Sequence, residues 1–195
     1  GDSYALDYED DDSVAFGGGM LFAANDGTLG RELYKSDGTV AGTVLVKDIY
    51  VGNSESLPNY LVVMGNTVYF RATDGINGEE LWKSDGTEAG TAMLKDLNPS
   101  GGSSPTYLTV IGNTIYFQAD DGTSGVELWK SDGTAAGTVM VKDINPSGSS
   151  YPDGMTAIGG TIYFGADDGT SGWELWKTDG TAAGTELVKD IHPTG

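Results

Sequence analysis

The chain has no cysteine and only one histidine, and each scarcity excludes a kind of chemistry. Without thiols there is no disulfide framework, no zinc–thiolate site and no cysteine nucleophile. A Ser/His/Asp triad needs a histidine base, but His192 lies in a terminal linker of Pro and Gly. The sequence therefore offers no catalytic residues and no cofactor-binding residues beyond a candidate metal site, and we expect the protein not to be an enzyme.

Basic side chains are also scarce, since 10 lysines and arginines stand against 29 acidic residues, for a net charge of −19. Such a surface repels phosphate, so we expect no nucleic acid as a partner. No apolar run approaches the roughly 18 residues of a membrane helix, so we expect no membrane insertion. The acidic leader, residues 1–12, lacks the basic and apolar regions of a signal peptide, so we expect a solvated leader on a mature or excised segment.

Glycine, in contrast, is abundant at 31 of 195 residues, and one motif recurs through the chain. The motif reads RELYKSDGT, EELWKSDGT, VELWKSDGT and WELWKTDGT in its four copies. Its central leucines are 48, 47 and 47 residues apart: Leu33, Leu81, Leu128 and Leu175. This periodicity predicts a single repeat domain over 13–195, with repeats at about 13–57, 58–104, 105–151 and 152–195.

Each copy contains the pattern of four short strands. In the third copy, an apolar run over 107–111 reaches a turn at Gly112, and a strand pattern follows over 114–119. VELWKS and TVMVKDI supply two more strands before a linker rich in Pro, Gly and Ser. No helical periodicity occurs, so the fold class is all-β. The repeat length favours blades of a β-propeller over a solenoid, either as a closed four-bladed ring or as part of a larger ring or array.

Several recurring residues fit a structural role better than a catalytic one. An aspartate precedes Gly-Thr at each hairpin tip, where its carboxylate accepts backbone N–H bonds and glycine supplies a positive φ. These aspartates are Asp37, Asp85, Asp132 and Asp179. All eight lysines also recur, and we expect them to form cross-strand ion pairs with the periodic acids, worth about 0.2 to 1 kcal/mol each.

Aromatic residues alternate with the central leucines, so the two sets face opposite sides of a strand. The aromatics are Tyr34, Trp82, Trp129 and Trp176. A strand that is apolar on both faces is typical of a propeller blade covered by a neighbour on each side, and this favours core packing over sugar stacking. Trp173 occurs in the last copy alone, beside a loop, and is the candidate for an exposed ligand contact.

A second set of recurring aspartates precedes Gly in the loops before the central motif. These are Asp26, Asp74, Asp121 and Asp168. Clustered carboxylates and carbonyls in Gly-rich loops suit calcium, which takes six to eight oxygen ligands. The sequence thus predicts Ca²⁺ as a candidate cofactor here, although an Asp-Gly pair is also an ordinary tight turn.

The segments ELWKSDGTEAGT, ELWKSDGTAAGT and ELWKTDGTAAGT, with RELYKSDGTVAGT, closely resemble the ELWxxDGT tandem-repeat family of bacterial secreted and cell-surface proteins. The resemblance covers residues 13–191. It implies an exported protein, extracellular or at the cell surface, and it supplies no catalytic residues to carry over.

The functional hypothesis is an extracellular, non-catalytic structural or adhesion module, stabilised by calcium. Its partner would be itself, in a ring, filament or array, or surface glycans and proteins. One alternative is a multivalent, lectin-like carbohydrate-binding propeller with sites that recur at the repeat spacing. Another is a propeller hydrolase or lyase, whose site would break the repeat symmetry.

Overall fold

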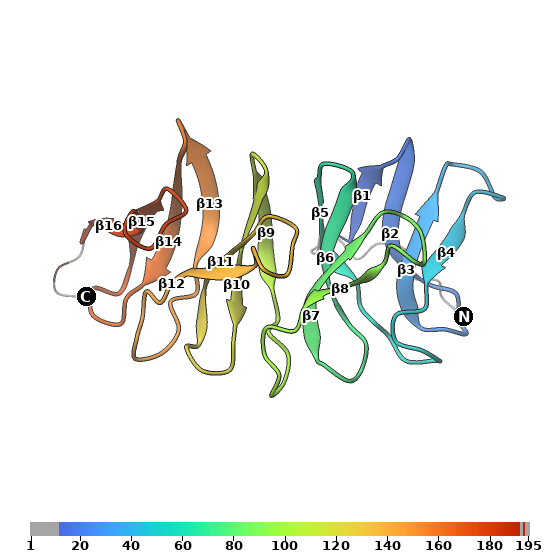
Figure 1. Cartoon of the computed structure of the whole chain (residues 1–195), viewed down its shortest axis with the longest axis horizontal. Helices are drawn as coiled ribbons and strands as arrows, with labels where there is room; N and C mark the ends of the chain where they lie inside the picture. The colour runs from blue at the N-terminus through green and yellow to red at the C-terminus, as the bar shows by residue number, and fades with distance from the viewer. Residues whose placement is uncertain (1–11, 192, 194–195) are drawn as a thin grey trace. The chain divides into compact units, whose positions relative to one another are not determined.

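The chain is built from antiparallel β-strands throughout residues 12–191, and these, with residue 193, are what the computed structural model describes (Figure 1). Sixteen strands form four sheets of four strands each. Each sheet is a meander, because its strands follow one another in chain order. The prediction of an all-β protein with four strands per repeat is confirmed. In this described part no helix is long and apolar enough to cross a membrane.

The strands recur at equivalent positions of the four repeats. The first sheet contains β1 (Ser13–Phe16), β2 (Gly19–Asn25), β3 (Arg31–Ser36) and β4 (Val44–Lys47). The second contains β5 (Asn59–Met64), β6 (Thr67–Thr73), β7 (Glu79–Ser84) and β8 (Ala92–Lys95). The third contains β9 (Thr106–Ile111), β10 (Thr114–Asp120), β11 (Val126–Ser131) and β12 (Val139–Lys142). The fourth contains β13 (Asp153–Ile158), β14 (Thr161–Asp167), β15 (Trp173–Thr178) and β16 (Glu186–Lys189).

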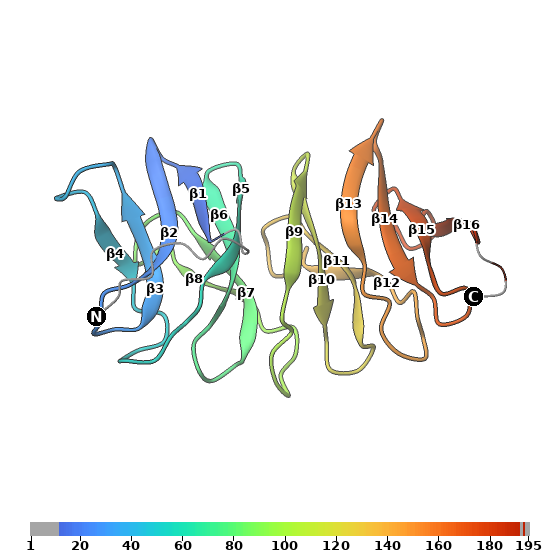
Figure 2. The same cartoon turned by 180° about the vertical axis from the view of Figure 1, so that it is seen from behind.

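The chain divides into two compact units, and each contains two of the sheets (Figure 2). The first unit, Gly1–Asp96 with Ser100–Ser104, holds the sheets β1–β4 and β5–β8. The second unit, Leu97–Pro99 with Pro105–Gly195, holds the sheets β9–β12 and β13–β16. The acidic leader lies outside the described residues except for Asp12, which is buried and forms an ion pair with Arg31.

Each unit has an apolar core made by the facing sides of its two sheets. In the first unit, Leu33 and Val46 of one sheet share a buried cluster with Phe70 and Trp82 of the next. The second unit repeats this cluster with Leu128, Val141, Phe164 and Trp176. The prediction that leucine and aromatic side chains serve opposite faces is therefore confirmed. Each such side chain contributes about 1.5 to 3 kcal/mol when it is fully buried.

A buried glutamate fixes the linker that connects one sheet to the next. The carboxylate of Glu127 accepts the backbone N–H of Ile144 at 2.8 Å and of Ser150 at 3.1 Å, and the Ser150 hydroxyl at 2.6 Å. Glu32 binds the N–H of Ile49 and both donors of Ser56 in the same way. Burial raises the pKa of both carboxyl groups, although these hydrogen bonds oppose the shift.

The predicted pairing of lysines with the periodic acids is wrong for four lysines, which donate instead to backbone carbonyls of the neighbouring sheet. In the first unit, Lys35 donates to Gly86 at 2.9 Å and Lys47 to Thr91 at 2.8 Å. The second unit repeats both contacts, at 2.7 Å and 2.8 Å: Lys130 to Gly180 and Lys142 to Thr185. The physical reason is that the glutamates are already committed to the linkers, while a carbonyl oxygen retains lone pairs for an ammonium group.

The SDGT turns are structural, as predicted. Asp37 Oδ1 accepts the N–H of Thr39 at 2.9 Å and its hydroxyl at 2.7 Å, and Gly38 has a φ of 88°. Thr43 then donates its hydroxyl to the carbonyl of Thr39 at 2.7 Å. Gly42 is required because a Cβ there would lie 2.0 Å from Asp37 Oδ1. The same contacts recur in all four repeats, which explains the pattern SDGT-x-A-G-T.

Candidate functional site

The Asp-Gly loops, proposed as calcium sites, use their carboxylates to close the loops. Asp26 Oδ1 accepts the N–H of Thr28 and of Leu29, both at 2.8 Å, and these bonds lower the pKa of Asp26 to about 2. Asp74, Asp121 and Asp168 accept two backbone N–H groups in the same way. Among the described residues, no group of three or more acidic or histidine side chains converges as a metal site would require. Calcium binding stays a prediction.

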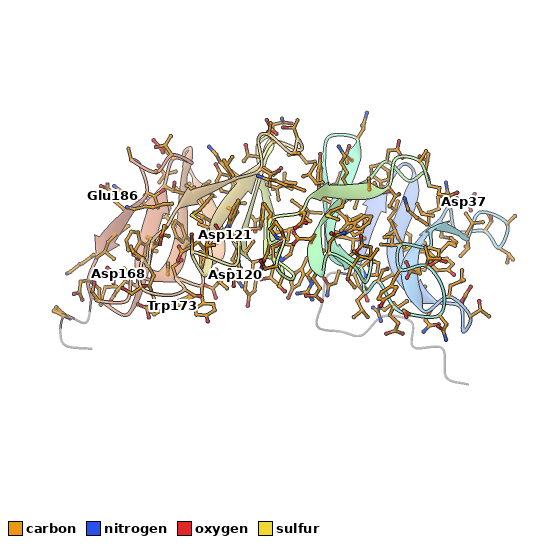
Figure 3. The ribbon with its side chains drawn as sticks, turned by 60° about the horizontal axis from the view of Figure 1, so that its bottom comes forward. Asp37, Asp120, Asp121, Asp168, Trp173 and Glu186 are labelled. Atoms are coloured by element: carbon orange, nitrogen blue, oxygen red, sulfur yellow. The ribbon has the colours of Figure 1, made fainter. Side chains whose placement is uncertain are left out.

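Trp173 lies at the start of β15 with 51% of its surface exposed, at the same edge of the second unit as Asp168 (Figure 3). Its indole covers Gly165, where a Cβ would approach Nε1 to 2.7 Å. The positions equivalent to Gly165 in the other repeats hold Ala23, Arg71 and Gln118. In the last repeat, the absence of a side chain at Gly165 thus makes room for the indole of Trp173, an aromatic residue that the other repeats lack at this position. The ligand contact predicted for Trp173 remains a prediction.

A groove opens between the two sheets at the SDGT turns, and it occurs in both units. In the first unit it has a volume of about 430 Å³ and its lining includes Phe16, Lys35 and Asp85. In the second unit the volume is about 490 Å³, with Tyr116 and Lys130 among the lining residues. A lysine, aspartates and an aromatic side chain thus border each groove. The sequence could not reveal these grooves, because they form only where two repeats pack together.

The side of the last sheet that faces away from the third sheet, which we call the tail face, exposes apolar side chains whose counterparts in the other repeats are buried. Its residues are Leu175, Lys177, Val188, Lys189 and Ile191. Leu175 is 40% exposed, whereas Leu33 and Leu128 are 0% and 1% exposed. Val188 is 43% exposed, against 5% for Val46. The tail face therefore has the composition of an inter-sheet surface, and no sheet of the described residues covers it.

The side of the first sheet that faces away from the second sheet, which we call the head face, is incompletely covered. It is formed by Met20, Phe22, Ala24 and Tyr34, all of intermediate exposure. In the other three sheets the residues at these positions are buried, as Phe70 and Trp82 show at 0% and 6%. Burial raises the pKa of Tyr34 to about 12, reinforced by a hydrogen bond to the Asp26 carboxylate. Neither face can be recognised from the sequence, since residues of similar type occupy these positions in every copy.

The fold is similar to the propeller-like portions of several solved hydrolases. A puromycin hydrolase matches with a TM-score of 0.57 and 15% identity, over 90% of this chain and 28% of that chain. The acylaminoacyl peptidase of Pyrococcus horikoshii matches with a TM-score of 0.58 and 12% identity, over 92% and 27%. A prolyl endopeptidase matches with a TM-score of 0.56 and 13% identity, over 88% and 24%. The likeness shows a shared propeller-like fold.

These neighbours correct the expectation that the protein is not an enzyme. The same kind of sheet arrangement occurs within peptidases, and this chain spans only about a quarter of their length. The lack of a recognisable triad in the sequence therefore does not exclude an enzyme. No protein-family model and no curated protein matches the chain, so the resemblance to the ELWxxDGT repeats stays a prediction.

Proposed function

We propose that the chain is a run of β-propeller blades that acts as a structural or adhesion module and assembles through its terminal sheet faces. One observation carries the proposal: Leu175 and Val188 are 40% and 43% exposed on the tail face, although their counterparts in the other sheets are buried. Adjacent apolar side chains exposed on a single face are typical of a surface that binds another protein.

The head face supports the same function from the other end of the repeat series. Phe22 and Tyr34 occupy the positions of Phe70 and Trp82, which pack against the preceding sheet inside the first unit. This surface therefore has the composition of one that receives a sheet, and the described residues cover it only in part. Because a propeller removes its sheet edges and faces by adding blades, a further blade is the natural partner of each face.

The charge and the repeat motif support a place outside the cell or at its surface. The net charge of −19 keeps the chain soluble and away from anionic lipid and nucleic acid. The resemblance to bacterial surface repeats supports the same location. Calcium would then act as a stabiliser at the Asp-Gly loops, where the carboxylates that close each loop retain further lone pairs.

Light scattering of the purified chain over a range of concentrations tests this function. We expect dimers or larger species whose fraction rises with concentration. A monomer at every concentration would overturn the proposal. Repeating the measurement with calcium and with a chelator tests the calcium part separately, since only calcium-stabilised assemblies dissociate in the chelator.

A second candidate function, the binding of carbohydrate, is favoured by the two grooves. Their volumes of about 430 and 490 Å³ fall within the range of small-molecule sites, and both combine lysine, aspartate and aromatic side chains. Ala41 and Ala136 line the two grooves and are exposed, so Ala41→Trp with Ala136→Trp would fill them. A glycan array should lose its signal with this variant and keep it with the matched control Ala183→Trp. An array without signal for the wild-type chain would exclude this candidate.

A further inference from the structure

We propose that the groove of the second unit binds an amino sugar, that is, a sugar whose amine carries a positive charge. This inference rests on the carbohydrate-binding candidate and adds the class of sugar and the groove that selects it. The groove lies between the third and fourth sheets, both of which belong to the second unit. Its volume of about 490 Å³ is within the range of small-molecule sites.

A buried tyrosine on the wall of this groove offers a hydroxyl group that no described residue binds. Tyr116 lies on β10 and is 7% exposed. Its hydroxyl lies against the turn of the fourth sheet, since a Cβ at Gly180 would approach this oxygen to 2.5 Å. Burial raises the pKa of Tyr116, so the hydroxyl keeps its proton. It can therefore both donate a hydrogen bond to a sugar hydroxyl and accept one.

Two ionised carboxylates border the same groove, one from a turn of each sheet. Hydrogen bonds from Thr134 lower the pKa of Asp132, and hydrogen bonds from Thr181 lower the pKa of Asp179. Both aspartates are therefore charged at neutral pH. In each, the threonine N–H and hydroxyl donate to Oδ1, so Oδ2 retains lone pairs for the ammonium group of a ligand.

The one basic side chain among the lining residues is already engaged. The ammonium group of Lys130 donates to the carbonyl of Gly180 at 2.7 Å. Two carboxylates against one ammonium leave the groove negatively charged, and the net charge of −19 adds to this field. Such a site attracts a cationic sugar more strongly than a neutral one and repels a uronic acid.

The first unit provides an internal comparison for the role of the hydroxyl groups. Its groove has the equivalent lysine and aspartates. However, Leu21 occupies the position of Tyr116, and Gly19 occupies that of Thr114. The hydroxyl groups that these two side chains give to the second groove are therefore missing from the first. We assign the amino sugar to the second groove, with one site per chain.

Titration calorimetry of the full chain with two disaccharides tests the selection by charge. One disaccharide consists of glucosamine, and the other consists of N-acetylglucosamine, in which the amine is acetylated and uncharged. We expect one glucosamine disaccharide per chain, bound about tenfold more tightly than the acetylated disaccharide. Its affinity should also fall as the salt concentration rises. Equal affinities for the two disaccharides would overturn the assignment of an amino sugar.

Tyr116→Phe tests the groove itself, because it removes the hydroxyl group and keeps the ring. We expect about fivefold weaker binding of the glucosamine disaccharide, the loss of one hydrogen bond. Tyr163→Phe makes the same change at the equivalent position of the last repeat, outside both grooves, and should bind as the wild-type chain does. Circular dichroism confirms that both variants are folded. An unchanged affinity in Tyr116→Phe would place the sugar elsewhere and overturn the assignment.

Cyclohexylamine distinguishes an amino-sugar site from a site for cations in general. It has a six-membered ring and an ammonium group but no hydroxyl groups, so it should not displace the glucosamine disaccharide. Displacement at similar concentrations of the two compounds would overturn the sugar assignment.

The outcomes separate this inference from the candidate function on which it rests. If the glucosamine disaccharide does not bind while a glycan array shows that other sugars do, the choice of an amino sugar is wrong and carbohydrate binding stands. If the array is silent as well, both are overturned.

Discussion

The ammonium group of Lys35 donates a 2.9 Å hydrogen bond to the carbonyl oxygen of Gly86, which lies in the turn of the next sheet. The bond joins residues 51 positions apart, and the second unit repeats it between Lys130 and Gly180. It shows that the lysines of the repeat hold sheet to sheet. In the fourth sheet, the equivalent Lys177 pairs with Glu186 of its own sheet.

This relationship predicts that replacing Lys35 weakens the first unit. Lys35→Met keeps most of the apolar stem and removes the donor, and we expect a loss of about 1 to 2 kcal/mol in the free energy of unfolding. Urea denaturation measures the change. Lys177→Met is the matched control, because its partner is the 60% exposed Glu186 and its removal should cost about 0.5 kcal/mol or less. Equal losses in both variants would contradict the inter-sheet role.

Glu127 should be one of the least replaceable polar residues. In Glu127→Gln, an amide NH₂ would face backbone N–H groups and the Ser150 hydroxyl that now bind carboxylate oxygens. A buried donor facing donors costs about 2 to 3 kcal/mol of stability. Denaturant unfolding tests this, with Glu186→Gln as the exposed control. A variant as stable as the wild-type chain would show that the linker does not depend on this carboxylate.

Acid should destabilise the protein through its turn aspartates. Hydrogen bonds hold the pKa of Asp26 at about 2, below its ordinary 3.8, so this carboxylate stabilises the fold above pH 3.8 and loses its contribution as the pH falls toward 2. The lowered pKa of Asp37 and Asp132 acts in the same direction. Thermal unfolding across this pH range should show a steeper acid decline for the wild-type chain than for Asp26→Asn. Parallel declines would contradict the role of this carboxylate, and Glu88→Gln serves as the control.

At alkaline pH, the stability of the protein should depend on the protonation of Tyr34. Its pKa is raised to about 12 from 10, so the folded chain keeps the phenolic proton in this window while the unfolded chain loses it. Stability should therefore fall as the pH rises from 10 to 12. Tyr34→Phe should remove part of this decline, as followed by denaturant unfolding at pH values below and within the window. An unchanged decline would show that Tyr34 is not protected.

The sequence alone predicted most of the local structure. Alternation of Leu33 with Tyr34 predicted two packed faces, and Asp37 with Gly38 predicted the turn that the hydrogen bonds show. These features depend on residues close together in the chain. The roles of Lys35 and Glu32 were predicted wrongly, because their partners lie in the next sheet or in the linker toward it. Composition also suggested a protein without enzymatic activity, and the peptidase neighbours corrected this.

The terminal faces could not be predicted for a related reason. Leu175 and Val188 have the same residue types as their buried counterparts Leu128 and Val141. Only the position of the last sheet leaves the first pair 40% and 43% exposed while the second pair is 1% and 5% exposed. A sequence repeat therefore predicts what each side chain is suited to contact. The structure shows which of these contacts the described residues make.

The reactivity of a single thiol on the tail face tests the central claim most directly. The chain has no cysteine, so Val188→Cys introduces the only thiol, and Val40→Cys at a 96% exposed position gives the control. If the tail face is covered by another copy, Val188→Cys should react at least tenfold more slowly with a thiol reagent in concentrated than in dilute solution, while Val40→Cys reacts at one rate. Equal rates for Val188→Cys at both concentrations would show that the tail face stays open, and would contradict assembly through it.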